Sequence, residues 1–342
     1  MNKKNLINTR KDDHLLINQS KDVYSSNTTG LDRLRFIHNA MPEMNFQKID
    51  LSTSFLGKSL DFPLLVSSMT GGTTQSVLIN RRLAEAAQHH QIAMGVGSQR
   101  IGLEQAKLME NFNVRKWAPD ILLFANLGAV QLNYGFCMDD CKRAVESIQA
   151  NALILHLNPL QEALMHEGDT NFSNLLGKIE KMNSALNVPL VIKEVGWGIS
   201  AGIAKKLFDV GISIIDVSGA GGTSWSEVEK FRAKDEIHKQ VAASFHGWGI
   251  PTATAIKEIR KQIPGITLIA SGGLRNGIDI AKCIALGAKL TGMAGNLLRA
   301  ASVSEKELDQ YLTILKTQLK TVMFVCGAKN VPALMKMTLI EK

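Results

Sequence analysis

The 342-residue chain lacks the features that mark membrane-bound, secreted and nucleic-acid-binding proteins. Its longest apolar runs, such as 121–125 (ILLFA), are too short to cross a bilayer, and charges break the opening MNKKNLINTRKDDHLL before a signal-peptide core can form. There is no run of about five basic residues, and only 3 tyrosines could act as stacking platforms. We therefore expect a cytoplasmic protein that binds neither membranes nor nucleic acid.

Cysteine is also scarce, with 4 residues in the chain. Cys137 and Cys141 lie one helical turn apart, but no second pair stands at the spacing of zinc ligands. Cys283 and Cys326 lie in apolar segments of helical periodicity. We expect four buried, reduced thiols rather than a cysteine zinc site.

Positive charge and glycine are what the chain has in excess. Lys and Arg number 39 against 31 Asp and Glu, a formal net charge of +8, which favours an anionic partner such as a phosphate metabolite. The 28 glycines gather in short clusters after apolar runs, where they permit tight turns and let backbone approach a ligand. The 45% hydrophobic content is enough for a large core.

Short runs rich in branched apolar residues recur at intervals that leave room for a helix. This alternation predicts right-handed crossovers and a parallel sheet. Eight units over roughly 240 residues favour a closed (β/α)8 TIM barrel over an open doubly wound sheet, because such barrels usually span about 250 residues. The runs are PLLVSSMT, IAMGVGSQ, ILLFANLG, NALILHLN, PLVIKEVG, ISIIDVSG, ITLIASGG and KLTGMAGN.

We expect one domain over residues 1–342, with the barrel at 63–300, an N-terminal extension at 1–62 and a C-terminal helical segment at 301–342. Residues 46–60 alternate around a Leu-Gly-Lys turn, which predicts a hairpin that plugs the N-terminal mouth of the barrel. The longest connection, 219–267, is predicted to be a lid, since long barrel loops are usually functional.

Polar residues gather at the carboxyl ends of the predicted strands, where (β/α)8 enzymes build their sites. A single polar residue there is as often a turn former, but the whole set predicts a site. Its members are Ser67, Ser68, Met69 and Thr70, then Ser98, Gln99 and Arg100, then Asn126, then His156, Asn158, Gln161 and Glu162, then Lys193 and Glu194, and finally Asp216 and Ser218.

Two glycine clusters on the same face predict a phosphate site. Residues 218–225 read SGAGGTSW and residues 271–277 read SGGLRNG. Glycine lets backbone N–H groups approach phosphate oxygens, and Arg275 adds charge. Lys193 ends an apolar strand, so its ammonium either faces an anionic ring such as a reduced flavin or forms a buried ion pair. A flat ring with a phosphate tail fits FMN.

The segment RKDDH, residues 10–14, places two cations and an imidazole before an apolar pair. Such a charge run is usually solvated. Folded over the barrel mouth, however, Arg10 and Lys11 would join Arg100 in clamping a second phosphate group. The expectation of an anionic substrate rests on that combination.

At these motifs the chain resembles the FMN-dependent type 2 isopentenyl diphosphate isomerases. The resemblance covers nearly the whole length and lies in RKDDH, GLDRLRFIHNAMPE, SSMTGGT, SQR, HLNPLQE, KEVGWGIS, DVSGAGGTSW and SGGLRNGIDIAK. It implies that isopentenyl and dimethylallyl diphosphate are interconverted with reduced FMN as acid and base, Mg²⁺ on the small-molecule diphosphate, and NADPH or NADH as initial reductant. It also implies a homotetramer or homooctamer. The group that removes the second proton stays open among flavin N5, Gln161 and a water.

The resemblance also implies roles for individual residues. Gln161 and His156 would be catalytic, and Glu162 would hold the Mg²⁺. Substrate would contact Arg10, Lys11, His14, Ser98, Arg100, Asn158 and Gln161. FMN would contact Ser68, Met69, Thr70, Ser98, Asn126, Lys193, Ser218, Thr223, Gly272, Gly273, Arg275, Ala294 and Gly295.

Three other interpretations fit part of the pattern. An FMN-dependent hydroxyacid oxidase or dehydrogenase would need a histidine beside an arginine at a strand end, and the only candidate, His246, is expected to make a packing or loop contact. An inosinate-dehydrogenase-like barrel would need a cysteine after the sixth strand, where GAGGTSW has none. A flavin-binding protein without catalysis would leave Gln161, Glu162 and the N-terminal cations without a role.

Overall fold

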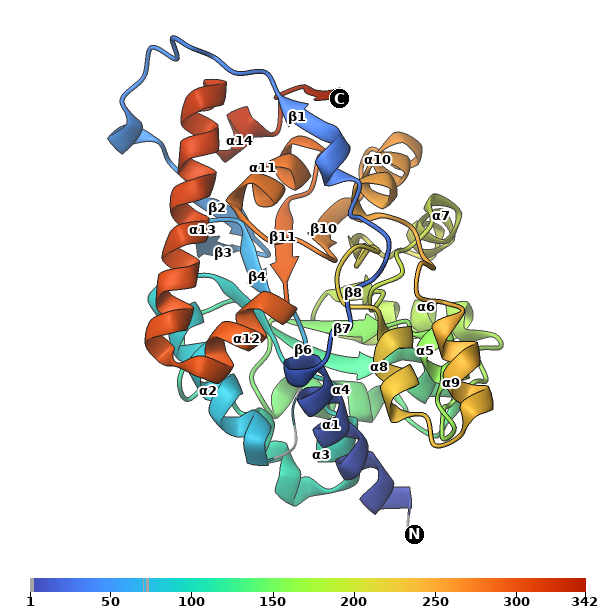
Figure 1. Cartoon of the computed structure of the whole chain (residues 1–342). Coiled ribbons are helices and arrows are strands. Elements are labelled where there is room, and N and C mark those ends of the chain that lie inside the picture. The colour runs from blue at the N-terminus through green and yellow to red at the C-terminus, as the bar shows by residue number, and fades with distance from the viewer. Residues whose placement is uncertain (1–2, 70, 72–73) are drawn as a thin grey trace.

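Eight parallel strands close into a barrel with helices on its outside, as the sequence predicts (Figure 1). The computed structural model describes residues 3–69, 71 and 74–342. Each predicted run supplies one strand, and almost every strand residue is buried, because the barrel interior covers one face and helices cover the other. The barrel strands are β4 (Leu64–Val66), β5 (Ala93–Gly95), β6 (Leu123–Gly128), β7 (Ala152–His156), β8 (Leu190–Lys193), β9 (Ile214–Asp216), β10 (Thr267–Ser271) and β11 (Leu290–Met293).

Helices follow the strands and form the outer layer (Figure 1). Those that return the chain to the next strand are α2 (Thr74–His89), α4 (Met138–Glu146), α6 (Leu175–Ala185), α7 (Ala201–Asp209), α10 (Thr252–Gln262) and α11 (Gly277–Ala285). Helix α12 (Gly295–Val303) follows the last barrel strand. Shorter helices in the connections are α3 (Arg100–Glu104), α5 (Pro159–Leu164), α8 (Trp225–Arg232) and α9 (Glu236–Ala243), with 3-10 turns η3 (Ala106–Phe112) and η4 (Ala129–Asn133).

A hairpin closes the amino-terminal mouth of the barrel. Strands β2 (Thr53–Phe55) and β3 (Lys58–Leu60) pair across a turn in which Leu56 and Gly57 both have positive φ, 49° and 77°. Phe55 and Leu60 are buried in one cluster with inward-facing strand residues such as Leu65 and Phe124. The plug prediction is therefore confirmed, but the pairing begins at Thr53 and not at residue 46.

The earlier start was wrong because residues 46–48 form a 3-10 turn, η2 (Phe46–Lys48). The side chain of Asn45 accepts a hydrogen bond from the Gln47 N–H, which caps that turn and keeps the segment out of the ladder.

The two ends of the chain cover the barrel from outside. Helix α13 (Glu305–Cys326) buries a stripe of leucines against α11 and α12, as its periodicity predicts. The Ser304 side chain caps its start, and Gly327 ends it in the left-handed region, at φ 80°. After η1 (Leu31–Arg33), strand β1 (Leu34–Phe36) pairs with β12 (Leu339–Glu341), which follows α14 (Val331–Leu334).

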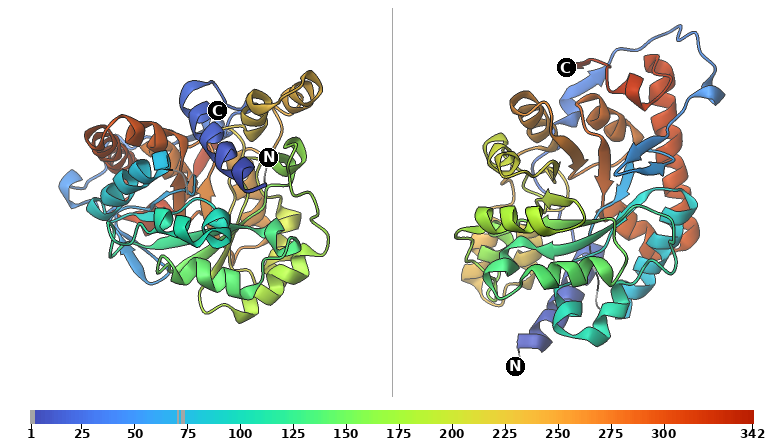
Figure 2. Two further views of the ribbon diagram at one scale, coloured as in Figure 1. Left: turned by 90° about the horizontal axis from the view of Figure 1, so that it is seen from below. Right: turned by 180° about the vertical axis from the view of Figure 1, so that it is seen from behind.

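Helix α1 (Lys3–Ser20) lies across the opposite end of the barrel, where the strands have their carboxyl ends (Figure 2, left). The connection 219–267 also lies at this end of the barrel, and its helices α8 and α9 form a pair next to α1 (Figure 1). It thus contains three helices rather than an irregular loop. Its movement as a lid stays a prediction.

The four cysteines are free thiols, but two of them are not buried as expected. Cys141 and Cys283 are buried and Cys326 is half-buried, but Cys137 is exposed because it is the residue that caps the start of α4. In the described part of the chain, no helix combines the length and apolar character that crossing a membrane requires.

Candidate active site

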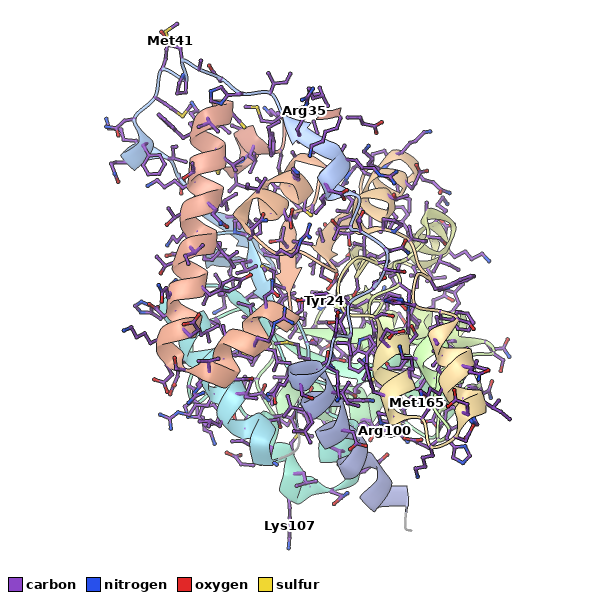
Figure 3. All side chains as sticks on the ribbon, in the orientation of Figure 1. Tyr24, Arg35, Met41, Arg100, Lys107 and Met165 are labelled. Carbon is purple, nitrogen blue, oxygen red and sulfur yellow. The ribbon has the colours of Figure 1, made fainter. Side chains whose placement is uncertain are left out.

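One pocket opens at the carboxyl ends of the barrel strands, beneath α1. Tyr24, Arg100 and Met165, labelled in Figure 3, lie on its walls. Almost all of the predicted site residues line it: Lys11, His14, Ser68, Met69, Ser98, Arg100, Asn126, His156, Asn158, Gln161, Glu162, Lys193, Ser218, Thr223, Gly272, Gly273, Arg275, Ala294 and Gly295.

Gln99, Glu194 and Asp216, which belong to the predicted set at the strand ends, do not line the pocket. Two further predicted residues are also missing from its lining. Thr70 lies outside the described residues. Arg10 is placed only as a backbone position in α1, one residue before Lys11.

The floor of the pocket is built around Lys193, the last residue of β8. Its ammonium is buried and donates hydrogen bonds to the Ser218 hydroxyl at 3.0 Å and to the Glu194 carbonyl oxygen at 2.6 Å. Asp216 stands opposite it on β9 and accepts a 2.6 Å bond from the Ser271 hydroxyl. Burial raises the pKa of Asp216, and the charge of Lys193 opposes that rise. Lys193 thus lines the pocket, and the Asp216 carboxyl group is next to it on the neighbouring strand.

Several buried polar atoms of the pocket wall have no hydrogen-bond partner among the described residues. They are Ser67 Oγ, Ser68 Oγ, Gln131 Oε1 and Asn158 Oδ1. Because an unsatisfied buried polar atom costs roughly 1–3 kcal/mol, such a set at one pocket indicates a polar ligand. Ser67 and Ser68 directly follow β4, which pairs with β11. Their hydroxyl groups match the hydrogen-bonding needs of an FMN ring or ribityl chain.

The two glycine clusters meet on one side of the pocket and leave no room for side chains. A Cβ on Gly222 would lie 2.6 Å from the Gly273 nitrogen, and a Cβ on Gly273, whose φ is 75°, would lie 2.4 Å from the Gly221 carbonyl carbon. Gly295 begins α12 beside them, and Arg275 lines the same side. Two glycine loops, a helix N-terminus and a guanidinium form a fitting cradle for the FMN phosphate.

The segment HLNPLQE ends β7 at His156 and starts α5 with Pro159 in the first turn. Asn158, the residue that caps α5, donates hydrogen bonds from Nδ2 to Glu162 Oε1 at 2.8 Å and to Gln161 Oε1 at 3.2 Å. The second Glu162 oxygen accepts from the Asp169 backbone N–H at 2.7 Å. The local sequence therefore holds an amide and a carboxylate side by side in the pocket wall.

His156 is fixed by a different partner, Asn126 within β6. The His156 Nδ1 lies 2.8 Å from Asn126 Oδ1. The imidazole is thereby oriented within the same wall.

The N-terminal cations come to the pocket with α1. Lys11 donates hydrogen bonds to the carbonyl oxygens of Gly71 at 2.7 Å and Ser98 at 3.0 Å. Arg100, which begins α3, contacts Asp169 at 2.6 Å through Nη1 and Glu104 at 2.9 Å through Nε. Of the three cations predicted to gather over the barrel mouth, Lys11 and Arg100 line the pocket, and Arg100 also pairs with two carboxylates.

Glu229 in α8 is a buried acid that the sequence does not single out. Its Oε1 lies 2.8 Å from His14 Nε2 and accepts a 3.4 Å contact from Gln161 Nε2, while Oε2 accepts from Arg232 at 2.6 Å. Burial would raise the pKa of Glu229, but the hydrogen bonds and charges of His14 and Arg232 hold it below its usual range. Glu229 therefore links α1, α5 and α8 through one carboxylate.

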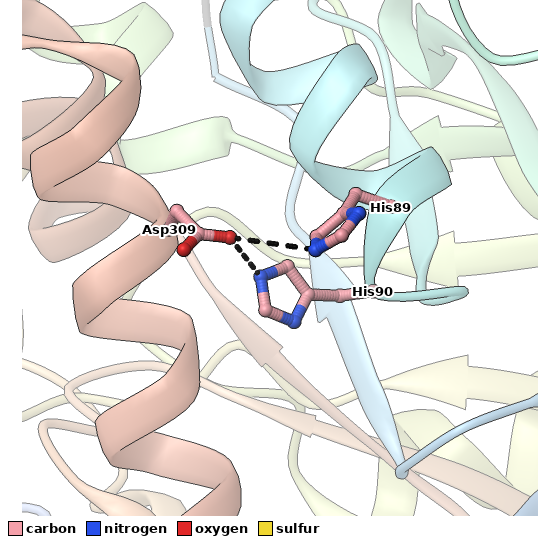
Figure 4. A group of neighbouring side chains, drawn as sticks. All are labelled: His89, His90 and Asp309. Atoms are coloured by element: carbon pink, nitrogen blue, oxygen red, sulfur yellow. Dashed lines mark hydrogen bonds and ion pairs between the residues drawn. The ribbon is translucent and has the colours of Figure 1, made fainter.

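Among the described residues, Glu162 does not belong to a group of three metal-ligating side chains. Across the described residues, His89, His90 and Asp309, which lie outside the pocket, form the one group of three such ligands (Figure 4). A single carboxylate still suits Mg²⁺, which keeps several waters and is usually shared between one or two carboxylates and substrate phosphates.

The histidine that an oxidase would need is occupied elsewhere. His246 Nε2 lies 2.9 Å from the Tyr24 carbonyl oxygen, and His246 does not line the pocket. The expected loop contact is confirmed.

The chain is similar to known proteins both at the level of a family and to individual relatives. The chain matches the family described as FMN-dependent dehydrogenase over residues 17–117 and 143–341. It is 50% identical to an isopentenyl-diphosphate delta-isomerase of Nostoc sp. over 327 residues, 95% of this chain and 93% of that protein. It is 49% identical to the protein of that name from Rickettsia typhi, with 96% of each chain covered.

Solved structures share the fold at low sequence identity. A mandelate oxidase variant superposes with a TM-score of 0.64 at 16% identity, covering 96% of this chain and 92% of that one. A flavocytochrome b2 variant superposes with a TM-score of 0.68 at 17% identity, covering 96% and 82%. These likenesses show the barrel architecture alone.

Proposed function

This chain belongs to the FMN-dependent dehydrogenase family and, within it, to the isopentenyl-diphosphate delta-isomerases, and from that membership we propose that it interconverts isopentenyl and dimethylallyl diphosphate. The observation that carries the proposal is the meeting of two half-sites in one pocket. One half is built from Lys193 and the glycine loops, and the other from Glu162 and the cations of α1 and α3. A flavin-binding protein without catalysis would need only the first.

The first half would hold FMN. Lys193 would stand against the anionic edge of the ring, and Ser68 and Asn126 would offer hydrogen bonds to its polar atoms. Gly272, Gly273 and Gly295 would present backbone N–H groups to the phosphate, with the charge of Arg275 next to them. When bound and reduced, FMN supplies an acid-base group at N5 and negative charge against the positive charge that develops on the substrate.

The second half would hold the diphosphate. Lys11, His14 and Arg100 lie on its wall with Ser98, and Glu162 faces the same space. Glu162 would hold the Mg²⁺, whose charge would help to bind the diphosphate, and Asn158 would orient the Glu162 carboxylate through their hydrogen bond. Arg100 would exchange its present carboxylate partner Asp169 for phosphate oxygens.

The reacting carbons would then lie between the two halves. Moving the double bond needs a proton added at one carbon and another removed nearby, and an unactivated alkene is a poor base. The chain supplies a dry, oriented environment: α1 covers the mouth and Leu15 and Trp225 line it. Gln161, held between Asn158 and Glu229, would meet the carbon that loses its proton, and His156 would line that end.

Several parts of the proposal come from the family resemblance. These are NADPH or NADH as the initial reductant, assembly as a homotetramer or homooctamer, and a cytoplasmic location. The lysines and arginines that line the pocket support a small-molecule diphosphate as the substrate.

The test is to incubate the purified flavoprotein without oxygen with isopentenyl diphosphate, Mg²⁺ and NADPH and to measure dimethylallyl diphosphate. We expect product with no net consumption of NADPH per turnover. A flavin-loaded protein that forms no product, or that instead releases peroxide from 2-hydroxy acids in air, would contradict the proposal.

A further inference from the structure

A second cluster of metal-ligating side chains lies outside the pocket, where α2 meets α13 (Figure 4). His89 is the last residue of α2, His90 follows it, and Asp309 projects from the first turns of α13. The turn that holds His90 leads into the amino-terminal end of β5, whereas the pocket lies at the carboxyl ends of the strands. The cluster is thus separate from the proposed reaction.

The ligand atoms are arranged around a common point. Asp309 Oδ1 lies 2.8 Å from His90 Nε2 and 3.8 Å from His89 Nε2, and the three ligand atoms all lie within 4.8 Å of one another. Two ligand atoms that each lie about 2.0–2.2 Å from a tetrahedral ion are about 3.4 Å from each other. This separation falls between the Asp309–His90 and Asp309–His89 distances. The imidazole planes cross at 86°, so the two rings do not stack face to face.

We propose that His89, His90 and Asp309 form a binding site for a divalent transition-metal ion of the Zn²⁺ class. Two imidazoles and one carboxylate favour Zn²⁺, Co²⁺, Ni²⁺ or Cu²⁺ over Mg²⁺, which prefers oxygen ligands. Water would complete the coordination on the exposed side, because the side chains of His89 and Asp309 are 75% and 55% exposed.

The protonation states and charges of the neighbours permit metal binding. Burial lowers the pKa of His90, while the hydrogen bond and charge of Asp309 oppose that change, so the neutral ring is favoured. Metal binding requires His90 Nε2 to release to solvent the proton that it donates to Asp309, and the ring then takes up a proton on Nδ1 and remains neutral with Nε2 on the ion. Lys316 is the nearby cation, and its ammonium is engaged by Asp61 at 3.1 Å. The C-terminal end of α2 also directs its carbonyl dipoles toward a cation.

The site would cross-link two elements of the outer layer. Helix α13 packs the C-terminal segment against the barrel and contacts α2. The ion would link α13 to α2 at this contact. A metal bound only by the folded protein raises its stability by mass action.

The test uses full-length, tag-free, flavin-loaded protein freed of metal, in excess Mg²⁺ to occupy the Glu162 region. Titration with Zn²⁺ by calorimetry, and with Co²⁺ by visible absorption, should show one ion per chain. We expect His89→Ala and Asp309→Asn to weaken binding at least tenfold. His38→Ala, which removes another exposed histidine, is the matched control and should bind as the wild type does.

Stability separates this site from adventitious binding. Zn²⁺ should raise the melting temperature of the wild type and of His38→Ala, and should leave that of His89→Ala unchanged. Basal isomerisation without Zn²⁺ should be equal in all of these proteins. Unchanged stoichiometry and affinity in both His89→Ala and Asp309→Asn would overturn the proposal, even if isomerase activity is found.

Discussion

Glu162 is the residue on which the proposed metal assignment depends. Replacing it by Gln removes the charge but keeps an oxygen that Asn158 can bond. We expect the Mg²⁺ concentration for half-maximal activity to rise by about tenfold or more, since a hydrogen bond or contact to a charged group contributes about 1.5–3 kcal/mol. The yellow colour should remain. Glu110→Gln, an exposed carboxylate change, is the control, and loss of FMN by Glu162→Gln would show that Glu162 is structural.

Glu194 gives a prediction about pH. One of its oxygens accepts hydrogen bonds from the backbone N–H groups of Val195, Gly196 and Trp197, each at 2.6 Å. Burial raises the pKa of Glu194 from 4.5 to about 7, although these N–H groups and Lys193 act against the rise. The folded state therefore holds a proton that the unfolded state releases, so stability is full below pH 4.5 and is lost as pH rises through 7.

The loss amounts to about 3 kcal/mol over that interval. Glu194→Gln cannot ionise, so its melting temperature should fall less than that of the wild type between pH 5 and pH 8. Parallel melting curves for the two proteins over this range would refute the role assigned to the Glu194 proton.

At this scale the sequence located the site but not all of its charges. Residues at strand ends were predictable because the architecture sends all carboxyl ends of parallel strands to one face. Glu229 and Asp169 were not, because each lies in a charged stretch that looks like any solvated helix or loop. Only the packing of α8 and the α5 connection against Arg100, His14 and Gln161 reveals that they are buried.

The glycine loops yield a prediction at the level of elements. A side chain on Gly273 would collide with the Gly221 backbone and would also strain a positive φ. Gly273→Ala should therefore reduce FMN content in the purified protein severely. Gly177→Ala in α6 is the matched control, because nothing lies within 4 Å of its added Cβ, and we expect it to retain FMN and gain up to about 1 kcal/mol of stability. Equal flavin content in both variants would contradict the cradle.

Elements with a regular period were predictable, and elements decided by distant partners were not. The eight strands, the hairpin turn and α13 follow from apolar periodicity and turn chemistry. The start of the hairpin was missed because an Asn45 side-chain bond defines η2. The segment RKDDH has no strong apolar stripe, so its place in α1 depends on contacts such as Lys11 with Ser98 and His14 with Glu229.

The whole molecule divides its tasks between the two ends of the barrel. The amino-terminal mouth is filled by the hairpin, and the open end carries the pocket beneath α1. The β1 and β12 pair joins the N-terminal extension to the C-terminal segment, so the chain that leaves α1 and passes the pocket at Tyr24 is anchored at β1. This arrangement places a pocket lined by several cations at the open end of the barrel.

The central claim is that isomerisation requires reduced FMN in this pocket. The most direct measurement compares flavin-stripped protein with the same protein reconstituted with FMN and reduced by dithionite, with isopentenyl diphosphate and Mg²⁺ but without oxygen or NADPH. We predict no dimethylallyl diphosphate from the stripped or oxidised protein and full recovery in the reduced one. Undiminished turnover by protein that carries no flavin would contradict the account.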